Sequence, residues 1–497
     1  MQTDWLKLKS GSDIRGDETQ LTDDFASRIG YVFALWLAKR KDTTPDKLTI
    51  AVGRDSRCSG PRLKKALIKG MTAADSDVLD CDLCTTPAMF MTTVNDETRA
   101  DGAVMITASH HPPVKNGFKF ITAEGGVTGA DVTELIQAAE TAQLPQRLVK
   151  PVDFLSLYTE GLKDQVRKWL DDDALKPLLG LHVVVDAGNG AGGFYAKFLE
   201  ELGADVEGSQ FLEPDGNFPN HVPNPENAAA MQAISEAVVK SGADLGVIFD
   251  TDCDRAAIVD QNGRGINRNR LIALIAAILL EEHPGATFVT DSVTSSGLAR
   301  FITEWGGVHY RFKRGYRNVI DEAIRLNEEG IDCPLAIETS GHAALRENYF
   351  LDDGTYLVTR LICEAMNRKR EGLTLSSLID ELQEPVESTE VRMNILAEDF
   401  KQAGQDVIET ILSHTLDDPS WRLAPDNREG VRIIFDLDGG VDNAWFLLRL
   451  SVHDPVMPLN AESDVPGGVK RMLSELYALL QGHDELDLEP LKKAIAE

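Results

Sequence analysis

The sequence predicts an α/β fold made of repeated strand–loop–helix units. Five short apolar runs each end in a polar loop that contains glycine or serine, and helix-like segments such as 60–73 and 234–241 separate them. This alternation is typical of sheets whose two faces are covered by helices. In such sheets the loops that follow the strands gather at one edge, where ligands bind. The runs and their loops are 48–52 with 53–57, 103–106 with 107–112, 181–185 with 186–190, 245–248 with 249–255, and 335–337 with 338–342.

The length of 497 residues predicts three or four domains. We expect three related mixed α/β domains at 1–150, 151–263 and 264–385. The remainder, 386–497, has a different pattern of expected strands and helices, which predicts a smaller α+β domain. Its expected elements are strands around 391–395, 431–436 and 445–450, a helix from Gly467 onward, and a terminal helix or frayed tail after Gly482.

Composition and charge exclude several classes of protein. The chain is 43% hydrophobic and 26% charged, as ordinary soluble proteins are. Its net charge of −30 argues against sequence-independent nucleic-acid binding and against adhesion to anionic membranes. The same charge repels phosphorylated small molecules, so a phosphosugar site would need its own arginines and lysines.

Targeting signals are not evident, which favours a cytoplasmic protein. Residues 1–16 are polar, and the longest apolar run, 271–280, is too short to span a bilayer and predicts a buried helix. Cys81 and Cys84 form a C-x-x-C pair without a second pair or a nearby histidine. We interpret them as buried thiols in a reducing cytosol, with redox activity as the lesser alternative.

Three aspartates follow the apolar run 245–248. Asp250, Asp252 and Asp254 alternate along the chain, and alternating side chains of an extended segment point the same way. Three carboxylates on one side repel each other unless a divalent cation lies among them. Oxygen ligands favour a hard ion, Mg²⁺ first. An acidic turn on a solvated face is the alternative.

Ser109 is the candidate nucleophile. It follows the strand 103–106 in a turn that also contains His110, His111 and the Pro112–Pro113 pair. A serine hydroxyl needs a neighbouring base or an attached phosphoryl group to react, and Lys119 or a histidine can move the proton. We expect the glycine before Lys119 to fold the backbone back toward this loop. A hydrogen-bonded turn without catalysis is the alternative.

Two further loops carry groups that suit a sugar phosphate. Glu338 and Ser340, followed by His342, offer an acceptor and a donor for vicinal hydroxyls, although serine there also fits a helix N-cap. Arg449 and Ser451 follow the strand 445–450 and suit a phosphate. The alternative for the arginine is a surface salt bridge.

These four segments, in this order, resemble the α-D-phosphohexomutase superfamily of phosphoglucomutases, phosphomannomutases and phosphoglucosamine mutases. The resemblance covers nearly the whole chain. It rests on a T-A-S-H-x-P loop at 107–112, a D-x-D-x-D-R loop at 250–255, an E-x-S-G-H loop at 338–342 and an R-x-S-x-x-x-P loop at 449–455, with supporting matches at 12–16, 53–60, 214–220 and 353–354.

The resemblance implies four domains around one central cleft and a phosphohexomutase, an isomerase that interconverts hexose 1-phosphate and hexose 6-phosphate of glucose or mannose. Ser109 would carry the phosphoryl group, and Mg²⁺ would be held by the three aspartates and a phosphoserine oxygen. A hexose 1,6-bisphosphate would be the intermediate and activator. The sequence leaves the oligomeric state open.

The resemblance also assigns the remaining residues. Catalysis would involve Arg15, Lys119, His110 and His342. Substrate would be bound by Glu338, Ser340, Arg314, Arg317, Arg449, Ser451 and His453.

Two departures from the family pattern leave alternatives open. Val452 and His453 replace the small residue and threonine that usually follow Ser451, and residues 311–317 are unusually basic. Phosphate binding would then shift partly to Arg314 and Arg317. The alternatives are a hexose-bisphosphate synthase, a phosphoglucosamine mutase, a phosphatase, and a non-catalytic sugar-phosphate sensor.

Overall fold

The computed structural model describes residues 5–144, 150–451 and 454–496. The chain divides into two compact units. The first consists of Met1–Asn267 and Ser340–Leu375, and the second of Arg268–Thr339 and Ser376–Glu497.

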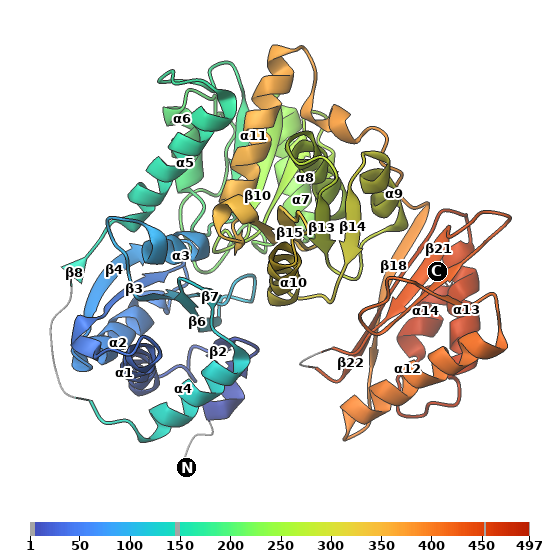
Figure 1. The fold of residues 1–497 in the computed structure, drawn as a ribbon, viewed down its shortest axis with the longest axis horizontal. Helices are drawn as coiled ribbons and strands as arrows, with labels where there is room; N and C mark the ends of the chain where they lie inside the picture. The colour runs from blue at the N-terminus through green and yellow to red at the C-terminus, as the bar shows by residue number, and fades with distance from the viewer. Residues whose placement is uncertain (1–4, 145–149, 452–453, 497) are drawn as a thin grey trace. The chain divides into compact units, whose positions relative to one another are not determined.

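The N-terminal sheet of the first unit has the strand order β1-β2-β6-β5-β3-β4-β8, with β7 paired to β6 (Figure 1). Neighbours β4, β3 and β5 run parallel to one another. Strand β6 runs antiparallel to both of its neighbours in this order, β5 and β2. The elements are η1 (Trp5–Leu8), β1 (Lys9–Ser10), β2 (Asp13–Asp17), α1 (Asp23–Arg40), η2 (Pro45–Lys47), β3 (Thr49–Arg54), α2 (Gly60–Ala73), β4 (Asp77–Leu83), α3 (Thr86–Val94), β5 (Gly102–Ile106), β6 (Lys115–Thr122), β7 (Gly125–Gly126), α4 (Gly129–Thr141) and β8 (Lys150–Pro151).

Helices cover both faces of this sheet, as the alternation of strands and helices predicts. Apolar residues of α1, α2 and α4 form one core with β3, β5 and β6, and α3 lies on the other face (Figure 1). Threonine side chains cap three of these helices: Thr22 accepts from Phe25 N, Thr85 accepts from Ala88 N, and Thr128 forms a capping box with Asp131. Because β3 and β5 are parallel, the loops that follow these two strands lie at the same edge of the sheet.

A smaller sheet in the first unit, β12-β11-β10-β9, carries the aspartate loop. Strands β9 and β10 are parallel, and β10 and β11 form an antiparallel hairpin in which Phe249 pairs with Ala256. The elements of this part of the unit are α5 (Phe154–Leu170), β9 (Val183–Asp186), α6 (Phe194–Glu201), α7 (Ala228–Ser241), β10 (Leu245–Phe249), β11 (Ala256–Asp260), β12 (Gly265–Ile266), β16 (Ala343–Leu345), η3 (Arg346–Asn348), β17 (Leu351–Asp352) and α11 (Gly354–Arg370).

The second unit begins with an α/β part and ends with an α+β part. In the former, β13 lies between β14 and β15 and is parallel to both. The latter is an antiparallel sheet of order β18-β22-β21-β20-β19 with its own apolar core. The elements are α8 (Arg268–Glu282), β13 (Thr287–Thr290), α9 (Ser296–Glu304), β14 (Val308–Arg311), α10 (Tyr316–Glu328), β15 (Leu335–Ile337), η4 (Leu375–Ile379), β18 (Glu387–Asn394), α12 (Phe400–Asp417), β19 (Arg422–Leu423), β20 (Val431–Phe435), β21 (Ala444–Leu448), β22 (Val456–Ser463), α13 (Gly468–Leu480) and α14 (Glu489–Ala496).

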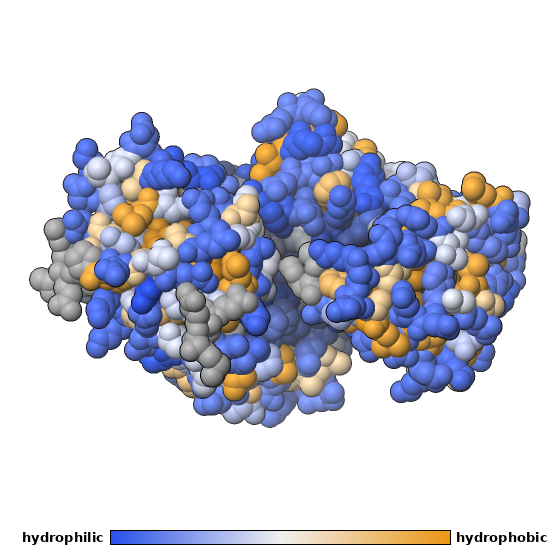
Figure 2. Space-filling view, turned by 90° about the horizontal axis from the view of Figure 1, so that it is seen from below, coloured by the Kyte–Doolittle hydropathy of each residue, from blue (hydrophilic) through white to orange (hydrophobic). Residues whose placement is uncertain are grey.

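The predicted fold class is confirmed in its elements. The apolar run 271–280 is a buried helix within α8, and the tail after Gly482 forms α14. The last expected strand is shorter than predicted, because β21 ends at Leu448 and Arg449 already lies in a loop. The face shown in Figure 2 is mostly hydrophilic, with apolar residues in scattered groups. Within the described ranges, no helix is both long and apolar enough to cross a bilayer.

Candidate active site

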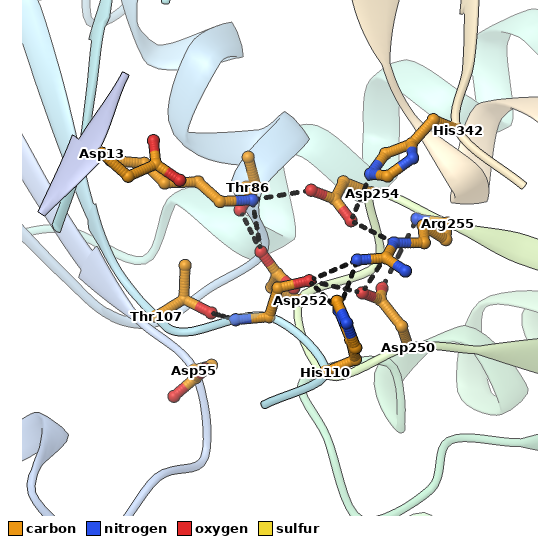
Figure 3. Close-up of polar contacts among 12 residues, drawn as sticks. Asp13, Asp55, Thr86, Thr107, His110, Asp250, Asp252, Asp254, Arg255 and His342 are labelled. Carbon is orange, nitrogen blue, oxygen red and sulfur yellow. Dashed lines mark hydrogen bonds and ion pairs between the residues drawn. The ribbon is translucent and has the colours of Figure 1, made fainter. Parts of the chain in front are cut away.

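The aspartate loop joins β10 to β11 and is buried. Asp250 and Asp252 are fully buried and Asp254 is 5% exposed. One oxygen of each carboxylate lies within 4.8 Å of the others (Figure 3). The predicted reason for this convergence was wrong. The loop is not extended: it turns, and Cys253 adopts a left-handed φ of 63°. The turn brings the carboxylates together, and their burial excludes the solvated acidic face.

The carboxylates fit a hard cation. Asp252 Oδ1 and Asp254 Oδ1 are buried and have no hydrogen-bond partner among the described residues. Such oxygens are costly to bury unless another group compensates them. An all-oxygen donor set is the kind that Mg²⁺ and similar ions prefer. The three aspartates can therefore hold a metal ion.

Neighbouring charges act differently on the three carboxylates. Burial, then Asp254 and Asp252, raise the pKa of Asp250 well above its ordinary value. Burial also opposes ionisation of Asp254, but the positive charges of Lys119, His342 and Arg255 outweigh it and hold the pKa of Asp254 below its ordinary value. The cations Lys119 and Arg255 of the same unit therefore favour the charged form of Asp254, whereas burial and the neighbouring carboxylates oppose ionisation of Asp250.

Ser109 lies directly against this loop. It follows β5, is 1% exposed and adopts a left-handed φ of 51°, which is uncommon for a residue with a side chain. Its Oγ donates to Asp250 Oδ2 at 3.1 Å and accepts from Arg255 Nη2 at 3.0 Å. Its backbone N–H donates to Thr107 Oγ1 at 2.8 Å (Figure 3). The strained turn thus aims the hydroxyl at the aspartates.

Arg57 holds the serine loop in this conformation. Its buried guanidinium donates to four carbonyl oxygens, those of Ser109, His111, Pro112 and Lys115. Asp55 completes the arrangement, because Arg57 Nε donates to its Oδ2 at 3.1 Å. Burial raises the pKa of Asp55 to about 6, although the charge of Arg57 opposes this shift. These four acceptors fix the path of the loop from Ser109 to Lys115.

Lys119 links β6 to the aspartate loop. Its Nζ lies 3.0 Å from Asp252 Oδ2 and 2.7 Å from Asp254 Oδ2. Burial lowers the pKa of Lys119, but these two carboxylates outweigh it and raise the pKa well above its ordinary value. The backbone at Gly117 returns to the serine loop as expected, and its carbonyl oxygen accepts from Thr107 N at 3.1 Å. Gly117 is part of β6, and a Cβ there would lie 2.2 Å from Ile14 O, so glycine permits close approach of β2.

Arg15 lies on β2, paired with Gly117 on β6. Its Nη2 donates to Asp13 Oδ2 at 2.8 Å. Burial lowers the pKa of Arg15, but Asp13 outweighs this effect and raises it. The strand pairing therefore brings Arg15 beside the strand that carries Lys119.

The two histidines after Ser109 are neutral at neutral pH. Burial, then the charge of Arg255, lowers the pKa of His110 to about 2. Burial and the charge of Arg15 lower the pKa of His111 to about 4. His110 Nδ1 lies 2.5 Å from Arg255 Nη2 and 3.4 Å from Ser109 Oγ. A neutral imidazole at this point can accept a hydrogen bond from either group.

His342 and Ser340 belong to the first unit and lie together. His342 Nε2 is 3.8 Å from Asp254 Oδ1, and its Nδ1 is 2.7 Å from Ser340 Oγ. An isolated bridge pairs the backbones of Arg255 and His342. The helix N-cap alternative for Ser340 is wrong, because the loop leads into strand β16. One nitrogen of His342 therefore faces the aspartate loop, and the other forms a hydrogen bond with Ser340.

Glu338 and Arg314 lie in the second unit. Glu338 Oε1 accepts from Gly315 N at 2.6 Å, and Gly315 has a φ of 117° that favours glycine. Arg314 Nε lies 3.9 Å from Asp291 Oδ2, and its backbone N–H donates to Glu429 Oε2 at 3.1 Å. Burial raises the pKa of Asp291, against the attraction of Arg314. Carboxylates thus hold the loop that precedes α10.

Arg449 is the second basic group of this unit. Its Nε is buried without a hydrogen-bond partner among the described residues, and no ion pair of its side chain occurs in that part of the chain. Burial lowers the pKa of Arg449 and the positive charge of Arg314 adds to this shift, whereas the negative charge of Glu429 opposes it. The surface salt bridge is therefore not what the structure shows. Two arginines close enough to repel are suited to share an anion.

The other predicted substrate residues are less well defined. Ser451 Oγ accepts from Asp454 N at 3.4 Å. Arg317 Nε pairs with Asp321 at 3.0 Å on α10. Val452 and His453 lie outside the described residues.

Several contributors were not among the predicted site residues. Arg57, Asp55 and Arg255 lie within motifs that carried the family resemblance, so their positions were available. Thr86 and Asp291 had no comparable signal. Thr86 donates from Oγ1 to Asp252 Oδ2 at 2.6 Å, a contact that joins residues far apart in the chain.

Comparison with known proteins identifies the family. The phosphoglucomutase/phosphomannomutase profiles match in chain order: alpha/beta/alpha domain I over residues 7–146, domain II over 156–263 and domain III over 267–386. These three ranges contain the serine loop, the aspartate loop and the Glu338 loop.

Similar proteins extend over nearly the whole chain. A phosphoglucomutase of Neisseria gonorrhoeae is 31% identical over 484 residues, which are 95% of this chain and 96% of the relative. A phosphomannomutase/phosphoglucomutase of Pseudomonas aeruginosa is 31% identical and covers 85% of each chain. The crystal structure of a phosphoglucomutase/phosphomannomutase family protein from Burkholderia thailandensis has a TM-score of 0.78 at 27% identity, covering 96% of this chain and 97% of that one. The chain therefore belongs to the phosphoglucomutase/phosphomannomutase family of the α-D-phosphohexomutase superfamily and is a phosphohexomutase, an isomerase that acts on a small sugar phosphate.

Proposed function

We propose that this enzyme interconverts the 1- and 6-phosphates of glucose, mannose or both, through a phosphoserine at Ser109 and a hexose 1,6-bisphosphate. One observation carries the proposal: Ser109 Oγ lies 3.1 Å from Asp250 Oδ2 and 3.0 Å from Arg255 Nη2 in a buried site. A hydroxyl held between a cation-binding carboxylate and a guanidinium is placed for phosphoryl transfer.

Ser109 exchanges one bond for another in this scheme. A free sugar hydroxyl forms a bond to phosphorus, the bond from phosphorus to Ser109 Oγ breaks, and the proton lost by the sugar hydroxyl ends on Ser109 Oγ, which becomes a hydroxyl again. The serine oxygen develops negative charge as it leaves. Arg255 Nη2 is within hydrogen-bond distance of that oxygen, so it would stabilise this charge. The reverse transfer from the other end of the bisphosphate restores the phosphoserine.

Asp250, Asp252 and Asp254 would hold Mg²⁺, together with an oxygen of the phosphorylated serine. The buried Oδ1 atoms of Asp252 and Asp254, which accept no hydrogen bond from any described residue, support this assignment. When bound, Mg²⁺ neutralises charge on the phosphoryl group.

Four further groups would manage protons and charge. Lys119 and Arg15 have raised pKa values and stay cationic, which supports a role in charge stabilisation, whereas proton transfer by either group stays a prediction. His110, which is neutral, can accept a hydrogen bond near Ser109 Oγ. His342 lies at the Asp254 side of the loop, where it would contribute a donor.

Substrate recognition would use the remaining residues. Glu338 and Ser340 would bind sugar hydroxyls, and Arg449 with Ser451 would bind the phosphate that is not transferred. Arg314 and Arg317 would share that phosphate. Arg449 has the strongest support, since its Nε is buried without a partner among described residues. The participation of His453 stays a prediction.

The proposal also includes an activator and a cellular location. A hexose 1,6-bisphosphate would act as activator, because it phosphorylates the serine of an enzyme that has lost its phosphoryl group. We also propose a cytoplasmic location, to which the buried free thiols of Cys81 and Cys84 conform.

The test is a parallel assay with purified enzyme, Mg²⁺ and catalytic glucose 1,6-bisphosphate. Glucose, mannose and glucosamine 1-phosphates are supplied separately, and each 6-phosphate is quantified. Turnover of glucose or mannose 1-phosphate supports the proposal. Turnover of glucosamine 1-phosphate alone would show that the enzyme is a phosphoglucosamine mutase. Accumulation of free hexose bisphosphate would favour a hexose-bisphosphate synthase. No 6-phosphate from any substrate would exclude the mutase activity.

A further inference from the structure

Thr86 connects helix α3 to the aspartate loop. It is the first residue of α3, after the N-cap Thr85, and is 9% exposed. Its Oγ1 donates to Asp252 Oδ2 at 2.6 Å, and its backbone N–H donates to Asp252 O at 3.1 Å. Amides in the first turn of a helix have no partner within the helix, so this one is available to the loop. The same residue therefore holds both the main chain and the side chain of Asp252 (Figure 3).

The two oxygens of Asp252 differ as a result. Oδ2 accepts from Thr86 Oγ1 at 2.6 Å and from Lys119 Nζ at 3.0 Å. Oδ1 is buried and has no hydrogen-bond partner among the described residues. A carboxylate whose one oxygen is fixed by two donors has a defined orientation, and the other oxygen is left for a ligand.

We infer that Thr86 is a positioning residue for the cation bound by the aspartate loop, and that it presents Asp252 Oδ1 as the ligand atom. The inference rests on the proposed function, which places a divalent cation there. Threonine suits the task because its branched side chain restricts χ1, whereas the long side chain of Lys119 has many rotamers. Thr86 thus defines the orientation and Lys119 supplies charge.

The test measures Mg²⁺ affinity by isothermal titration calorimetry in the full-length enzyme. Thr86→Val removes the hydroxyl at nearly constant volume and should weaken Mg²⁺ binding about tenfold or more, the usual effect of losing a group that orients a metal ligand. Thr86→Ser keeps a donor and should restore most of the affinity. The comparison separates the hydroxyl from the packing of the side chain.

Thr85→Val is the matched control. Thr85 lies beside Thr86, is fully buried, and its hydroxyl accepts from Ala88 N, so it caps α3 without touching Asp252. We expect Thr85→Val to lower the unfolding temperature and to leave Mg²⁺ affinity within about twofold of wild type. Equal Mg²⁺ affinities for Thr86→Val and Thr85→Val would overturn the inference, as would a Thr86→Ser variant as weak as Thr86→Val.

A fourth variant separates this inference from the proposed function. Asp250→Asn removes the charge of a proposed ligand directly. If it weakens Mg²⁺ binding while Thr86→Val does not change it, only the role of Thr86 is wrong. If Asp250→Asn binds Mg²⁺ like wild type, the cation site itself is wrong, and the role of Thr86 is refuted with it.

Discussion

Ser109 Oγ lies 3.1 Å from Asp250 Oδ2, although 141 positions separate the two residues in the sequence. The contact joins the loop after β5 to the loop after β10, two different sheets of the first unit. It places the candidate nucleophile on the candidate cation site.

Replacing Ser109 with alanine should abolish phosphoryl transfer. Loss of a covalent nucleophile lowers kcat by several orders of magnitude, about 10⁴-fold or more. The measurement is mutase turnover together with mass spectrometry of the protein after incubation with glucose 1,6-bisphosphate. Ser76→Ala is the control, because Ser76 is also buried but donates only to Pro45 O at 3.0 Å. Full activity of the Ser109 variant would remove the proposed nucleophile.

Asp252→Asn should weaken Mg²⁺ binding and leave residual activity. The amide keeps an oxygen in place but loses the charge, so the ligand set is weaker and intact in shape. Activity should rise as Mg²⁺ is added, whereas wild type saturates at lower concentration. A variant whose activity is the same at every Mg²⁺ concentration as that of wild type contradicts the assignment.

Arg57→Met should destabilise the first unit and slow catalysis. It leaves Asp55 buried without its cation, a change that typically costs about 3–5 kcal/mol, and it frees the carbonyls around the strained Ser109. Denaturant unfolding and kcat are the measurements. Arg57→Lys tests geometry, because lysine keeps the charge but lacks the planar fork that reaches four carbonyls. Wild-type stability of both variants would show that Arg57 does not hold the loop.

Arg449→Met should raise the KM for hexose phosphate more than it lowers kcat. A charge-assisted hydrogen bond contributes about 1.5–3 kcal/mol, or about 10- to 150-fold in affinity. Arg422→Met is the control, since Arg422 forms exposed ion pairs with Asp436 and Asp442 in the same α+β part. Equal KM values for the two variants would assign the phosphate to other groups.

The free energy of unfolding of the first unit should fall as the pH rises and His221 loses its proton. Its Nε2 lies 3.0 Å from Asp186 Oδ2 and its Nδ1 lies 3.0 Å from Val222 O, so both nitrogens face acceptors. Burial lowers the pKa of His221, but Asp186 outweighs burial and raises it. Because the pKa of His221 is higher in the folded state, its protonated form stabilises the fold. This contribution is complete below the unfolded-state pKa of about 6.5 and is lost as the pH rises through the folded-state pKa.

The measurement is the unfolding midpoint of wild type and His221→Gln from about pH 5.5 to about pH 9, a range that brackets the ordinary histidine pKa. The difference between the two proteins should be largest at the acidic end and shrink as pH rises. A difference that is constant over this range would refute a charged His221.

Much of the fold follows from local patterns. The boundaries of α2 and β15 agree with the expected segments, because their apolar periodicity and flanking residues define them within a few residues. The run 271–280 was identifiable as a buried helix for the same reason. The division into domains at 150, 263 and 385 stays a prediction, and the two compact units cut the chain at other points.

The sequence by itself determined the α/β fold class, the family and the candidate site residues, because motifs such as 107–112 and 250–255 are contiguous and distinctive. Only the tertiary structure decided how they meet. The turn at Cys253, the clamp of Arg57 and the contact of Thr86 with Asp252 join segments distant in the chain. Which buried donor meets which acceptor depends on the packing of whole strands and helices, and no local pattern encodes it.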